Sequence, residues 1–492
     1  MNSSTEDIKY RINSFCEQYL PPTIPSVKNK KIIHDTIWHT NSFEPYEVAI
    51  IDTPLFQRLR SISQMGFVNY VYPSAKHTRF EHSLGVTVLA SKMCDQINSN
   101  DPDNLPISLC DKRSIRLSAL LHDIGHCLFS HTSESIYGLY VSNFFQEKKE
   151  ISPVPHEIFG YLIITSNSFK VFFDKLKLKY PAIETIDIDE VASRIIGKTD
   201  NELSRYKTSI INGQFDADKL DYLFRDSTFC GLAIDIDVDR LLHDMKATLY
   251  PVNGDNICDL TIGKSAVSSF EQIIFNKMIF ASKIYHHHKV RAIDCMFERV
   301  FEYILDNNIP IRINGETRPI ESPVDFLYLL DYDLHRIKDS VTNDSYLTNL
   351  INDILNRNLI KRAFVFDKKS FKDSVNGMDL LDTGCIASSD RKSLQRELAL
   401  KIAQDAKIPD KYWKDVWVDI KKPPQFLKGI DTTYVRSQNC DLQNISQFYP
   451  YKEYQDLYQT HKLQYYVFSP ESYTTSVNNS SKKILKEKYN IY

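Results

Sequence analysis

The sequence lacks the features that mark membrane-spanning and secreted proteins. Its 492 residues contain no apolar run close to the roughly 18 residues that a membrane span needs. The first residues, from Met1 to Asp7, supply neither the basic nor the apolar segment of a secretory leader. The nine cysteines are odd in number and include no Cys-x-x-Cys pair, which favours reduced thiols over disulfides or a zinc knuckle. We therefore expect a cytoplasmic protein that has no membrane partner.

Glycine and net charge are also low. The formal charge of −3 gives no general electrostatic attraction for nucleic acid, so any polyanion would have to bind at a local basic patch. Gly263-Lys264-Ser265 resembles the end of a P-loop, but the glycine that this motif needs five residues earlier is Cys258. A phosphate cradle of that type is therefore excluded.

The distribution of apolar residues predicts a mainly α-helical protein. From about Ile50 to Val300 the pattern is helical, with apolar stripes in Arg113–His122 and Phe270–Arg299. After about Asn308, short β-prone runs such as Lys361–Phe366 and Tyr412–Ile420 alternate with turns. We expect a helical catalytic body followed by a smaller α+β C-terminal lobe, with segments at 1–47, 48–308 and 309–492.

The most informative string is Leu120-Leu-His-Asp-Ile-Gly-His126. It places His122 and Asp123 side by side on an apolar helix. Burying an imidazole beside a carboxylate is costly unless a ligand compensates, and a divalent cation held by nitrogen and oxygen donors would do so. A His-Asp pair alone is a weak signal because chance pairs are common.

Three further strings add histidine and carboxylate groups. Arg79-Phe-Glu-His82 precedes an apolar run, and His156-Glu157 follows two prolines at an expected helix start. Phe215–Asp226 holds four carboxylates, a lysine, an arginine and a tyrosine among apolar residues. Such a cluster is commonly a solvated face, but the alternation with apolar residues directs some of the acids inward.

Taken together, these strings resemble the HD superfamily. More narrowly, they are similar to deoxynucleoside triphosphate triphosphohydrolases, and most of all to the group of the SAM-and-HD-domain restriction factor and its bacterial relatives. The motifs that carry the resemblance are Asp52–Arg60, His77–Gly85, His122–His126, Phe129–His131 and Asp218–Asp226. The similarity is strong from Lys31 to Val300 and fainter beyond. Only about thirty residues precede it, so we expect no SAM domain there.

The resemblance implies a divalent metal ion at the HD motif. The four ligands that it implies are His82, His122, Asp123 and Asp218. Such a donor set leaves coordination positions free for water and a phosphate oxygen. Iron, manganese, zinc or nickel suits the imidazoles, and magnesium can join through the phosphates.

The resemblance also implies roles around a nucleotide. His126 and His156 lie beside the α-phosphate and deliver a proton to the leaving oxygen, with Glu157 polarising His156. The substrate-binding residues are Gln64, Arg79, His131, Lys219, Tyr222, Asp226 and Tyr285, of which Arg79, Lys219 and Tyr222 hold phosphates and Gln64 and Asp226 lie near the sugar and base. Without the resemblance, Tyr222 is equally well explained as a core tyrosine.

One helix departs from the family pattern. The family has an arginine and then a tyrosine before a His-Lys-Val string, and this chain offers Lys277 and either Tyr285 or His286. That tyrosine closes the pocket against a ribose 2′-hydroxyl, so deoxy preference is less secure than hydrolysis. Consecutive residues of a helix point in different directions, so the run His286–His288 is not expected to be a three-ligand metal site.

A second nucleotide site is implied upstream. Lys31, Asp52, Gln57 and Arg60 match positions that bind an activating nucleotide between subunits, whereas His34 replaces the usual asparagine. An ordinary basic helix face is the alternative. The expected partners are a nucleotide substrate, an activating nucleotide and further copies of this chain in a dimer or tetramer.

The implied activity is hydrolysis of deoxynucleoside triphosphates to deoxynucleoside and triphosphate. Two alternatives stay open. One is another HD phosphohydrolase or phosphodiesterase that acts on a different nucleotide. The other is a nucleotide-responsive, nucleic-acid-binding protein, for which the basic run Lys482–Lys488 is a candidate contact, although a solvated tail explains that run as well.

Overall fold

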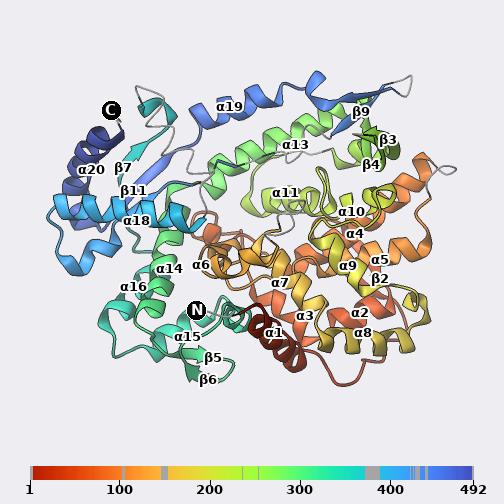
Figure 1. The fold of residues 1–492 in the computed structure, drawn as a ribbon, viewed down its shortest axis with the longest axis horizontal. Helices are drawn as coiled ribbons and strands as arrows, with labels where there is room; N and C mark the ends of the chain where they lie inside the picture. Colours follow the sequence, from red (N-terminus) through yellow and green to blue (C-terminus); the bar gives the residue numbers. More distant parts are fainter. Residues whose placement is uncertain are drawn as a thin grey trace.

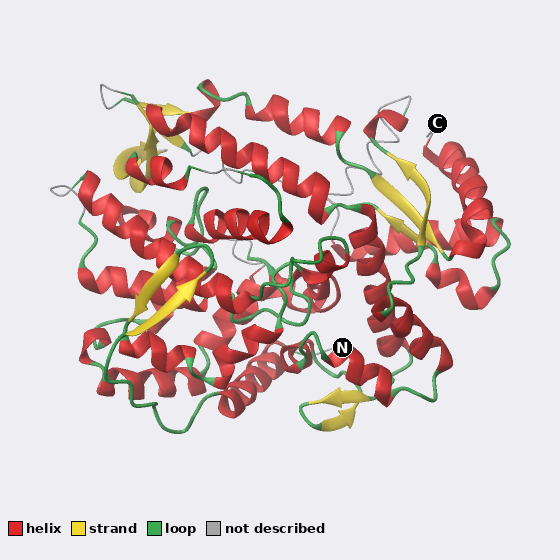
Figure 2. Cartoon of the chain, turned by 180° about the vertical axis from the view of Figure 1, so that it is seen from behind, coloured by secondary structure: helices red, strands yellow, loops and turns green. Residues whose placement is uncertain are grey.

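The computed structural model describes residues 4–101, 106–145, 153–234, 237–252, 254–371, 388–421, 423–424, 426, 433–437 and 441–489 (Figure 1). This part of the chain is mainly helical, and its strands form four small sheets around the helices (Figure 2). The prediction of a helical body with a smaller α+β C-terminal region is therefore confirmed.

Twelve of the described helices precede residue 244 and form the body that carries the HD motif. Their ends follow local capping signals: Ser108 begins α5 by accepting a hydrogen bond from Asp111 N at 3.0 Å, and Asp216 begins α11 by accepting from Lys219 N at 2.7 Å. The helices are α1 (Thr5–Tyr19), α2 (Pro45–Ile51), α3 (Pro54–Gln57), α4 (Arg79–Asn100), α5 (Leu109–Leu121), α6 (His131–Val141), α7 (Pro155–Ile164), α8 (Asn167–Lys179), α9 (Ile188–Ile195), α10 (Arg205–Ser209), α11 (Ala217–Cys230) and α12 (Val238–His243).

The helices of the second half pack beside this body. The expected helical run Phe270–Arg299 is interrupted, because a π-helical turn at Ala281–Tyr285 separates two straight helices. The basic run Lys482–Lys488 is not a free tail, since it lies in the last helix and buries Leu485. The helices are α13 (Val267–Phe280), α14 (His288–Asp306), α15 (Asp333–Ser340), α16 (Ser345–Leu355), α18 (Ser388–Asp405), α19 (Tyr451–His461) and α20 (Thr474–Tyr489).

Each sheet has two to four strands. The sheets are β1 (Lys31–Asp35) with β2 (His39–Phe43); β10 (Leu442–Asn444), β9 (Tyr434–Arg436), β4 (Asp255–Gly263) and β3 (Met245–Val252); β7 (Lys361–Phe366), β11 (Tyr465–Ser469) and β8 (Trp417–Asp419); and β5 (Ile311–Ile313) with β6 (Glu316–Arg318). All pairs are antiparallel except β4 with β9.

Two sequence-based expectations about strands were wrong. The region expected to be helical contains the β3–β4 hairpin, in which Thr248 and Thr261 are diagonal neighbours across the two strands with their hydroxyls 2.6 Å apart. Cross-strand pairs of this kind stabilise a hairpin and are invisible to helical periodicity. Of Tyr412–Ile420, only Trp417–Asp419 forms a strand, because Asp410–Asp415 forms a 3₁₀ helix.

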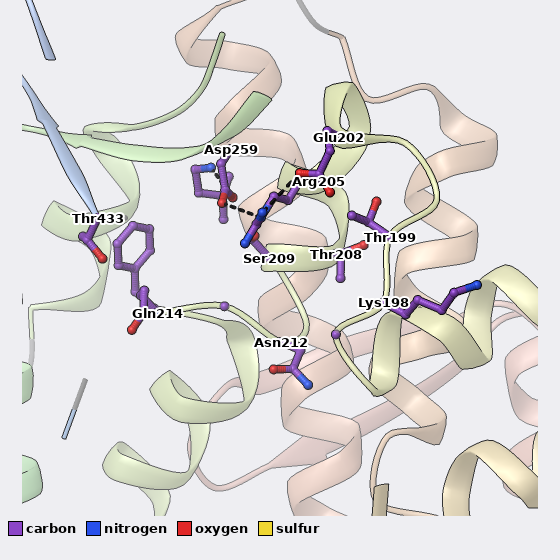
Figure 3. A pocket seen from close by; sticks show the side chains of 14 residues that line it. Lys198, Thr199, Glu202, Arg205, Thr208, Ser209, Asn212, Gln214, Asp259 and Thr433 are labelled. Carbon is purple, nitrogen blue, oxygen red and sulfur yellow. Dashed lines mark hydrogen bonds and ion pairs between the residues drawn. The ribbon is translucent and has the colours of Figure 1, made fainter. Parts of the chain in front are cut away.

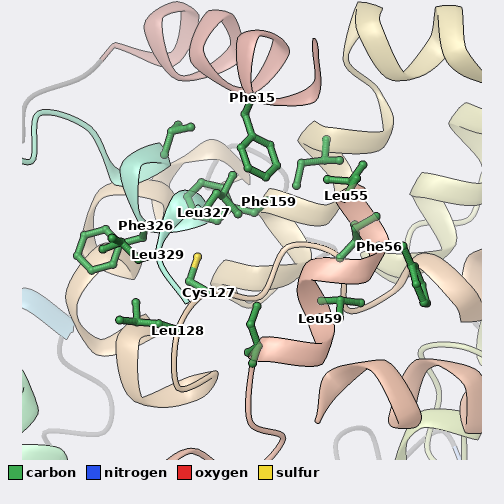
Figure 4. Close-up of a cluster of buried hydrophobic side chains, with 14 of the residues drawn as sticks. Phe15, Leu55, Phe56, Leu59, Cys127, Leu128, Phe159, Phe326, Leu327 and Leu329 are labelled. Carbon is green, nitrogen blue, oxygen red and sulfur yellow. The ribbon is translucent and has the colours of Figure 1, made fainter. Parts of the chain in front are cut away.

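A buried apolar cluster packs around the loop that follows the HD motif (Figure 4). It joins Phe15 of α1 and Leu55, Phe56 and Leu59 near α3 to the loop that carries Cys127 and Leu128. The helix before the motif is equally buried, so the chain around His122 and Asp123 has little freedom. The cysteines in the described ranges are free thiols, and no helix there is both long and apolar enough to cross a membrane.

Candidate active site

Three helices bring the expected metal ligands together. His82 lies in the first turn of α4, and His122 ends α5, with Asp123 next to it. Asp218 lies in the first turn of α11, where the helix dipole favours a negative charge. His82, His122 and Asp123 are buried, and Asp218 is half-buried.

The donor atoms of these residues lie close to one another. The Nε2 atom of His82 is 3.0 Å from Asp218 Oδ1, 3.3 Å from His122 Nε2 and 3.7 Å from Asp123 Oδ2. The Nε2 atom of His122 is 3.3 Å from Asp123 Oδ1 and 3.7 Å from Asp218 Oδ1. Atoms that bind one cation at roughly 2.0–2.3 Å lie about 3–4 Å from one another, so the spacing fits a shared ion.

The tautomers of the two histidines also fit a cation. His82 Nδ1 lies 2.7 Å from Asp221 Oδ2, and His122 Nδ1 lies 2.8 Å from the carbonyl oxygen of Ala119. Each Nδ1 atom therefore carries a proton, and both Nε2 atoms, which are the ones available to a metal, point into the same space. Burial lowers the pKa of His82, but hydrogen bonds to Asp218 and Asp221 outweigh burial and raise it to about 10. The two Nε2 atoms lie 3.3 Å apart, so a proton or a cation must offset the repulsion of their lone pairs. The residues present therefore fit a divalent metal ion.

Charge stabilises the ionised form of the two carboxylates. Burial opposes ionisation of Asp123, but Arg79 and the neighbouring imidazoles outweigh it and hold the pKa well below the ordinary value. Burial likewise opposes ionisation of Asp218, and hydrogen bonds from His122 and His82 hold its pKa well below the ordinary value. Anionic carboxylates are the form that binds a metal.

A second cluster of titratable groups lies beside the first. The ring of His126 stacks on that of His156 with centroids 3.8 Å apart, and His126 Nε2 is 3.3 Å from Asp123 Oδ1. His156 Nδ1 lies 2.6 Å from Glu134 Oε1, and His131 Nδ1 lies 3.2 Å from Glu134 Oε2. The structure thus joins His126, His131 and His156 through a glutamate that the sequence analysis did not identify.

The polarising role expected of Glu157 stays a prediction; its charge adds to that of Glu134 in raising the pKa of His156, and its carboxylate also makes hydrogen bonds elsewhere. Its Oε2 accepts a hydrogen bond from Val154 N at 2.8 Å, which caps α7, and its Oε1 accepts from Asn212 at 3.2 Å. Glu134, rather than Glu157, contacts the ring of His156. The reason is geometric, because adjacent helical residues project in different directions and the partner comes from α6 instead.

The two stacked histidines differ in their protonation. Burial lowers the pKa of His126 well below its ordinary value, and the positive charges of Arg79 and His156 lower it further. Burial would also lower the pKa of His156, but the Glu134 carboxylate outweighs burial and raises it. The two rings are therefore shifted in opposite directions: His126 favours the neutral form, and His156 is the more readily protonated of the two. Such a division is of the kind that separates acid and base roles.

The expected phosphate-binding residues line the same region. Arg79 donates to Asp123 Oδ2 at 2.8 Å, to Ser130 Oγ at 2.9 Å and to the Gln64 carbonyl oxygen at 3.1 Å. Lys219 donates to the Gly213 carbonyl oxygen at 2.9 Å and forms an ion pair with the Asp216 side chain. Both cations therefore lie near the metal ligands.

The expected sugar and base contacts form a third group. The hydroxyl of Tyr285 donates to Asp226 Oδ2 at 2.7 Å, and His77 Nε2 lies 2.8 Å from Asp226 Oδ1. The backbone N–H of Gln64 donates to the backbone carbonyl oxygen of His77 at 3.0 Å. Tyr285, at the end of the π-helical turn, therefore faces this group, and its role in place of the family tyrosine stays a prediction.

Tyr222 and Lys277 complete the comparison with the expected site. Tyr222 is half-buried, and burial together with the charge of Asp218 raises its pKa well above the ordinary value. Lys277 is buried and donates to the carbonyl oxygen of Phe426 at 3.4 Å. A phosphate role for Tyr222 stays a prediction.

The residues expected to bind an activating nucleotide lie away from the metal ligands and form two pairs. Lys31 Nζ lies 3.5 Å from Asp52 Oδ1, and both side chains are exposed. Arg60 donates to Gln57 Oε1 at 2.8 Å and covers the ring of Phe80. Their exposure leaves both pairs accessible to a ligand or to another chain.

Two cavities, each of about 270 Å³, lie outside the metal site. The first is polar, and Figure 3 shows Arg205 between Glu202 and Asp259 in its wall. It adjoins the phosphate-binding region, because Gly213 in its lining accepts the hydrogen bond from Lys219. The second lies between α14 and β7 and is basic, with its charged lining supplied by Lys289, Arg357, Lys361 and Arg362.

Comparisons with known families agree with this geometry. The HD domain family matches residues 79–223, which include the four expected metal ligands and Asp221. A family described as the HD associated region matches residues 236–490, more than half of the chain.

Individual relatives match part of this chain, and the match covers only part of their own length. An uncharacterized protein of Methanocaldococcus jannaschii is 34% identical over 284 residues, which are 57% of this chain and 52% of that protein. The deoxynucleoside triphosphate triphosphohydrolase SAMHD1 homolog of Dictyostelium discoideum is 31% identical over 341 residues, or 68% and 60%. The Homo sapiens deoxynucleoside triphosphate triphosphohydrolase SAMHD1 is 29% identical over 291 residues, or 56% and 45%. The chain thus spans about half the length of the curated relatives that it matches.

Proposed function

Because this chain belongs to the HD-domain family and combines an HD domain with the HD associated region, we propose that it is a metal-dependent phosphohydrolase of deoxynucleoside triphosphates. The products would be a deoxynucleoside and intact triphosphate. The observation that carries the proposal is the convergence of His82, His122, Asp123 and Asp218 next to His156, whose pKa is raised by the Glu134 carboxylate. The names of the relatives from Dictyostelium and Homo sapiens support the choice of substrate.

A divalent cation at these ligands would activate water and polarise a phosphate oxygen. Iron, manganese, zinc and nickel suit the imidazole donors. Arg79 and Lys219 lie close enough to exchange their present acceptors for phosphate oxygens and so neutralise the triphosphate.

The proton for the leaving group would come from His156. Its pKa is raised and its Nδ1 is held by Glu134, so its Nε2 proton is available to the 5′ oxygen of the deoxynucleoside. His126 stacks on this ring and keeps it oriented. Tyr285 and Asp226 would pack against the sugar, where a tyrosine ring discriminates against a 2′-hydroxyl by size.

Product analysis tests the proposal. Purified protein would be incubated with each deoxynucleoside triphosphate and each ribonucleoside triphosphate, and the products separated by ion-exchange chromatography. We expect deoxynucleoside and triphosphate in equal amounts, and no products from an Asp123→Asn variant. Stepwise release of orthophosphate, or activity only on another class of nucleotide, would favour a different HD phosphohydrolase.

We further propose that a second nucleotide activates the enzyme at a boundary between copies of this chain. The support is the exposed set Lys31, Asp52, Gln57 and Arg60, together with the basic cavity between α14 and β7, whose charges suit phosphate. Nucleotide would be titrated while mass and rate are recorded together for wild type and Arg60→Ala. If a second nucleotide activates the enzyme, mass and rate should both rise in wild type. Arg60→Ala should lose this response while keeping its metal. Hyperbolic rates at constant mass in both proteins would exclude it.

A further inference from the structure

A buried hydrogen-bond network links the β1–β2 hairpin to the metal ligand His82. The hairpin lies on the outside of the helical body (Figure 2). Its first residue, Lys31, precedes His82 by more than forty residues in the sequence. The network runs through Arg225, whose side chain is 0% exposed, and Asp221, which is also 0% exposed. Fully buried charges of this kind persist only where every partner is supplied.

Asp221 connects the network to the metal site. Its Oδ2 lies 2.7 Å from His82 Nδ1 and accepts from Arg225 Nε at 2.8 Å. Its Oδ1 accepts from Arg225 Nη2 at 3.0 Å and from Trp38 Nε1 at 2.5 Å. The carboxylate therefore sets both the tautomer and the angle of the His82 ring, which is how a residue behind a metal ligand controls it.

The helix that carries His82 is shaped to admit this pair. A Cβ atom at Gly85 would lie 2.1 Å from Asp221 Oδ1 and 2.3 Å from Arg225 Nη2. These separations are far below any contact distance, so only glycine lets Asp221 and Arg225 pack on α4 one turn after His82. The absence of a side chain at Gly85 therefore leaves the space that Asp221 and Arg225 occupy.

The hairpin supplies the other end. Arg225 donates to Asp35 Oδ1 at 2.8 Å and to Asp35 Oδ2 at 3.0 Å. The same Oδ2 accepts from the backbone N–H groups of Ile37 and Trp38, at 3.1 and 2.9 Å, and so holds the turn between the strands. The indole of Trp38 also packs beside Phe224, with centroids 6.2 Å apart. The turn and the network are one unit.

We infer that Asp35, Trp38, Arg225 and Asp221 form a positioning chain that couples the order of the β1–β2 hairpin to metal binding at His82. A metal ion that fixes the His82 ring would fix Asp221 and, through Arg225, the hairpin turn. The coupling is reciprocal, so an ordered hairpin would strengthen metal binding by the same factor.

The positioning chain gives the proposed regulation by a second nucleotide a physical route, and this consequence rests on the proposed function. Lys31 lies on β1 of the same hairpin, and its strand ends at Asp35. A nucleotide held by Lys31 would order the hairpin and so bias the metal site. The coupling itself is measured with zinc alone and without nucleotide, so its outcome does not depend on whether the chain hydrolyses nucleotides.

The test uses the full chain after its metal has been removed by a chelator. Zinc would be titrated while Trp38 emission is recorded, with a Trp38→Phe variant used to subtract Trp413 and Trp417. Hydrogen exchange of residues 31–43 would be measured with and without zinc. Asp35→Asn removes one of the two carboxylate oxygens that bind Arg225. Thr40→Val is the matched control, since Thr40 lies on the same hairpin and its exposed hydroxyl contacts His34. Circular dichroism checks that each variant is folded.

We expect zinc to change Trp38 emission and to slow exchange across the hairpin in wild type and in Thr40→Val. Asp35→Asn should lose both responses and bind zinc about 10–100-fold more weakly, the usual loss when support behind a ligand is removed. Trp38→Phe, which removes one donor from Asp221, tests the same link through zinc affinity should Asp35→Asn fail to fold. Unchanged zinc affinity in the folded variants, with hairpin exchange insensitive to zinc, would overturn the inference.

Discussion

Asp331 lies outside the HD domain and is predicted to hold the catalytic loop, the segment that carries Phe129 and Ser130. Its Oδ1 accepts from Phe129 N at 2.6 Å, and its Oδ2 accepts from Ser63 N at 2.8 Å and from the Ser63 hydroxyl. Phe129 and Ser130 both have a φ of 51°, in the left-handed region that non-glycine residues rarely adopt. The loop leads directly to His131, so a clamp on it positions the histidine cluster.

The magnitude follows from the groups that Asp331→Ala would leave without an acceptor. Two backbone N–H groups lose their partner, at about 1–3 kcal/mol each, so the free energy of unfolding should fall by roughly 2–6 kcal/mol. The two left-handed residues cost about 1–3 kcal/mol each and persist only because the surroundings hold them. Once released, the loop should relax, and a displacement of about 1 Å at the histidines lowers turnover by about 10²-fold.

The assay compares Asp331→Ala with Asp333→Ala. Asp333 lies two residues away and accepts from Leu330 N at 2.8 Å, so its loss removes a similar local cap without touching the catalytic loop. Denaturant unfolding gives the stability change, and initial rates with a deoxynucleoside triphosphate give the turnover number. We expect Asp333→Ala to lose about 0.5–2 kcal/mol and to keep its turnover within about twofold.

Metal content should be unchanged in both variants, because Asp331 contacts neither His82 nor Asp218 in the described structure. The reasoning would be refuted if Asp331→Ala lost no more stability than Asp333→Ala and turned over at the wild-type rate. A loss of stability without a loss of turnover would show that the clamp supports the fold but not the chemistry.

Four further predictions concern single side chains. His122→Ala should fold and retain almost no metal by elemental analysis; wild-type metal content in it would remove His122 from the ligand set. His156→Ala should lower turnover by ~10²–10⁴-fold with its metal retained, and Glu134→Gln should lower it less and move the alkaline limb of the rate profile to lower pH, because the carboxylate that raises the pKa of His156 is gone. An alkaline limb that stays in place in Glu134→Gln would show that Glu134 does not set the pKa of His156. Burial and the charges of Lys421 and Arg291 lower the pKa of His286 to about 3, so the folded state keeps this ring neutral while the unfolded chain protonates it near 6.5. Stability should therefore fall as the pH drops below about 6.5, and His286→Phe should lose less stability between about pH 6.5 and 4.5 than wild type does; equal losses in thermal unfolding would contradict this.

The sequence was sufficient for the helical fold class and for most of the residues that meet at the site. The reason is that His122 and Asp123 are adjacent, and the strings around His82 and Asp218 are short and distinctive. Glu134 was missed because its spacing from His131 is that of any helical pair. Only the packing of α6 on α7 brings it to His156.

The β3–β4 hairpin and the π-helical turn were missed for different reasons. The hairpin is fixed by contacts between its strands, which helical periodicity does not detect. The turn at Ala281–Tyr285 adds one residue to a helix without changing its composition, so the contact of Tyr285 with Asp226 could not be predicted from the sequence. The network from Asp35 to His82 spans residues far apart in the chain and has no signature in the sequence.

Hydrolysis at the α-phosphorus can be followed in water enriched in oxygen-18, because the attacking oxygen then carries the label. Wild type and His122→Ala would be incubated with a deoxynucleoside triphosphate, and both products analysed by mass spectrometry. We expect one labelled oxygen in the triphosphate, none in the deoxynucleoside, and no products from His122→Ala. Label in the deoxynucleoside, release of orthophosphate, or undiminished hydrolysis by His122→Ala would contradict the proposal.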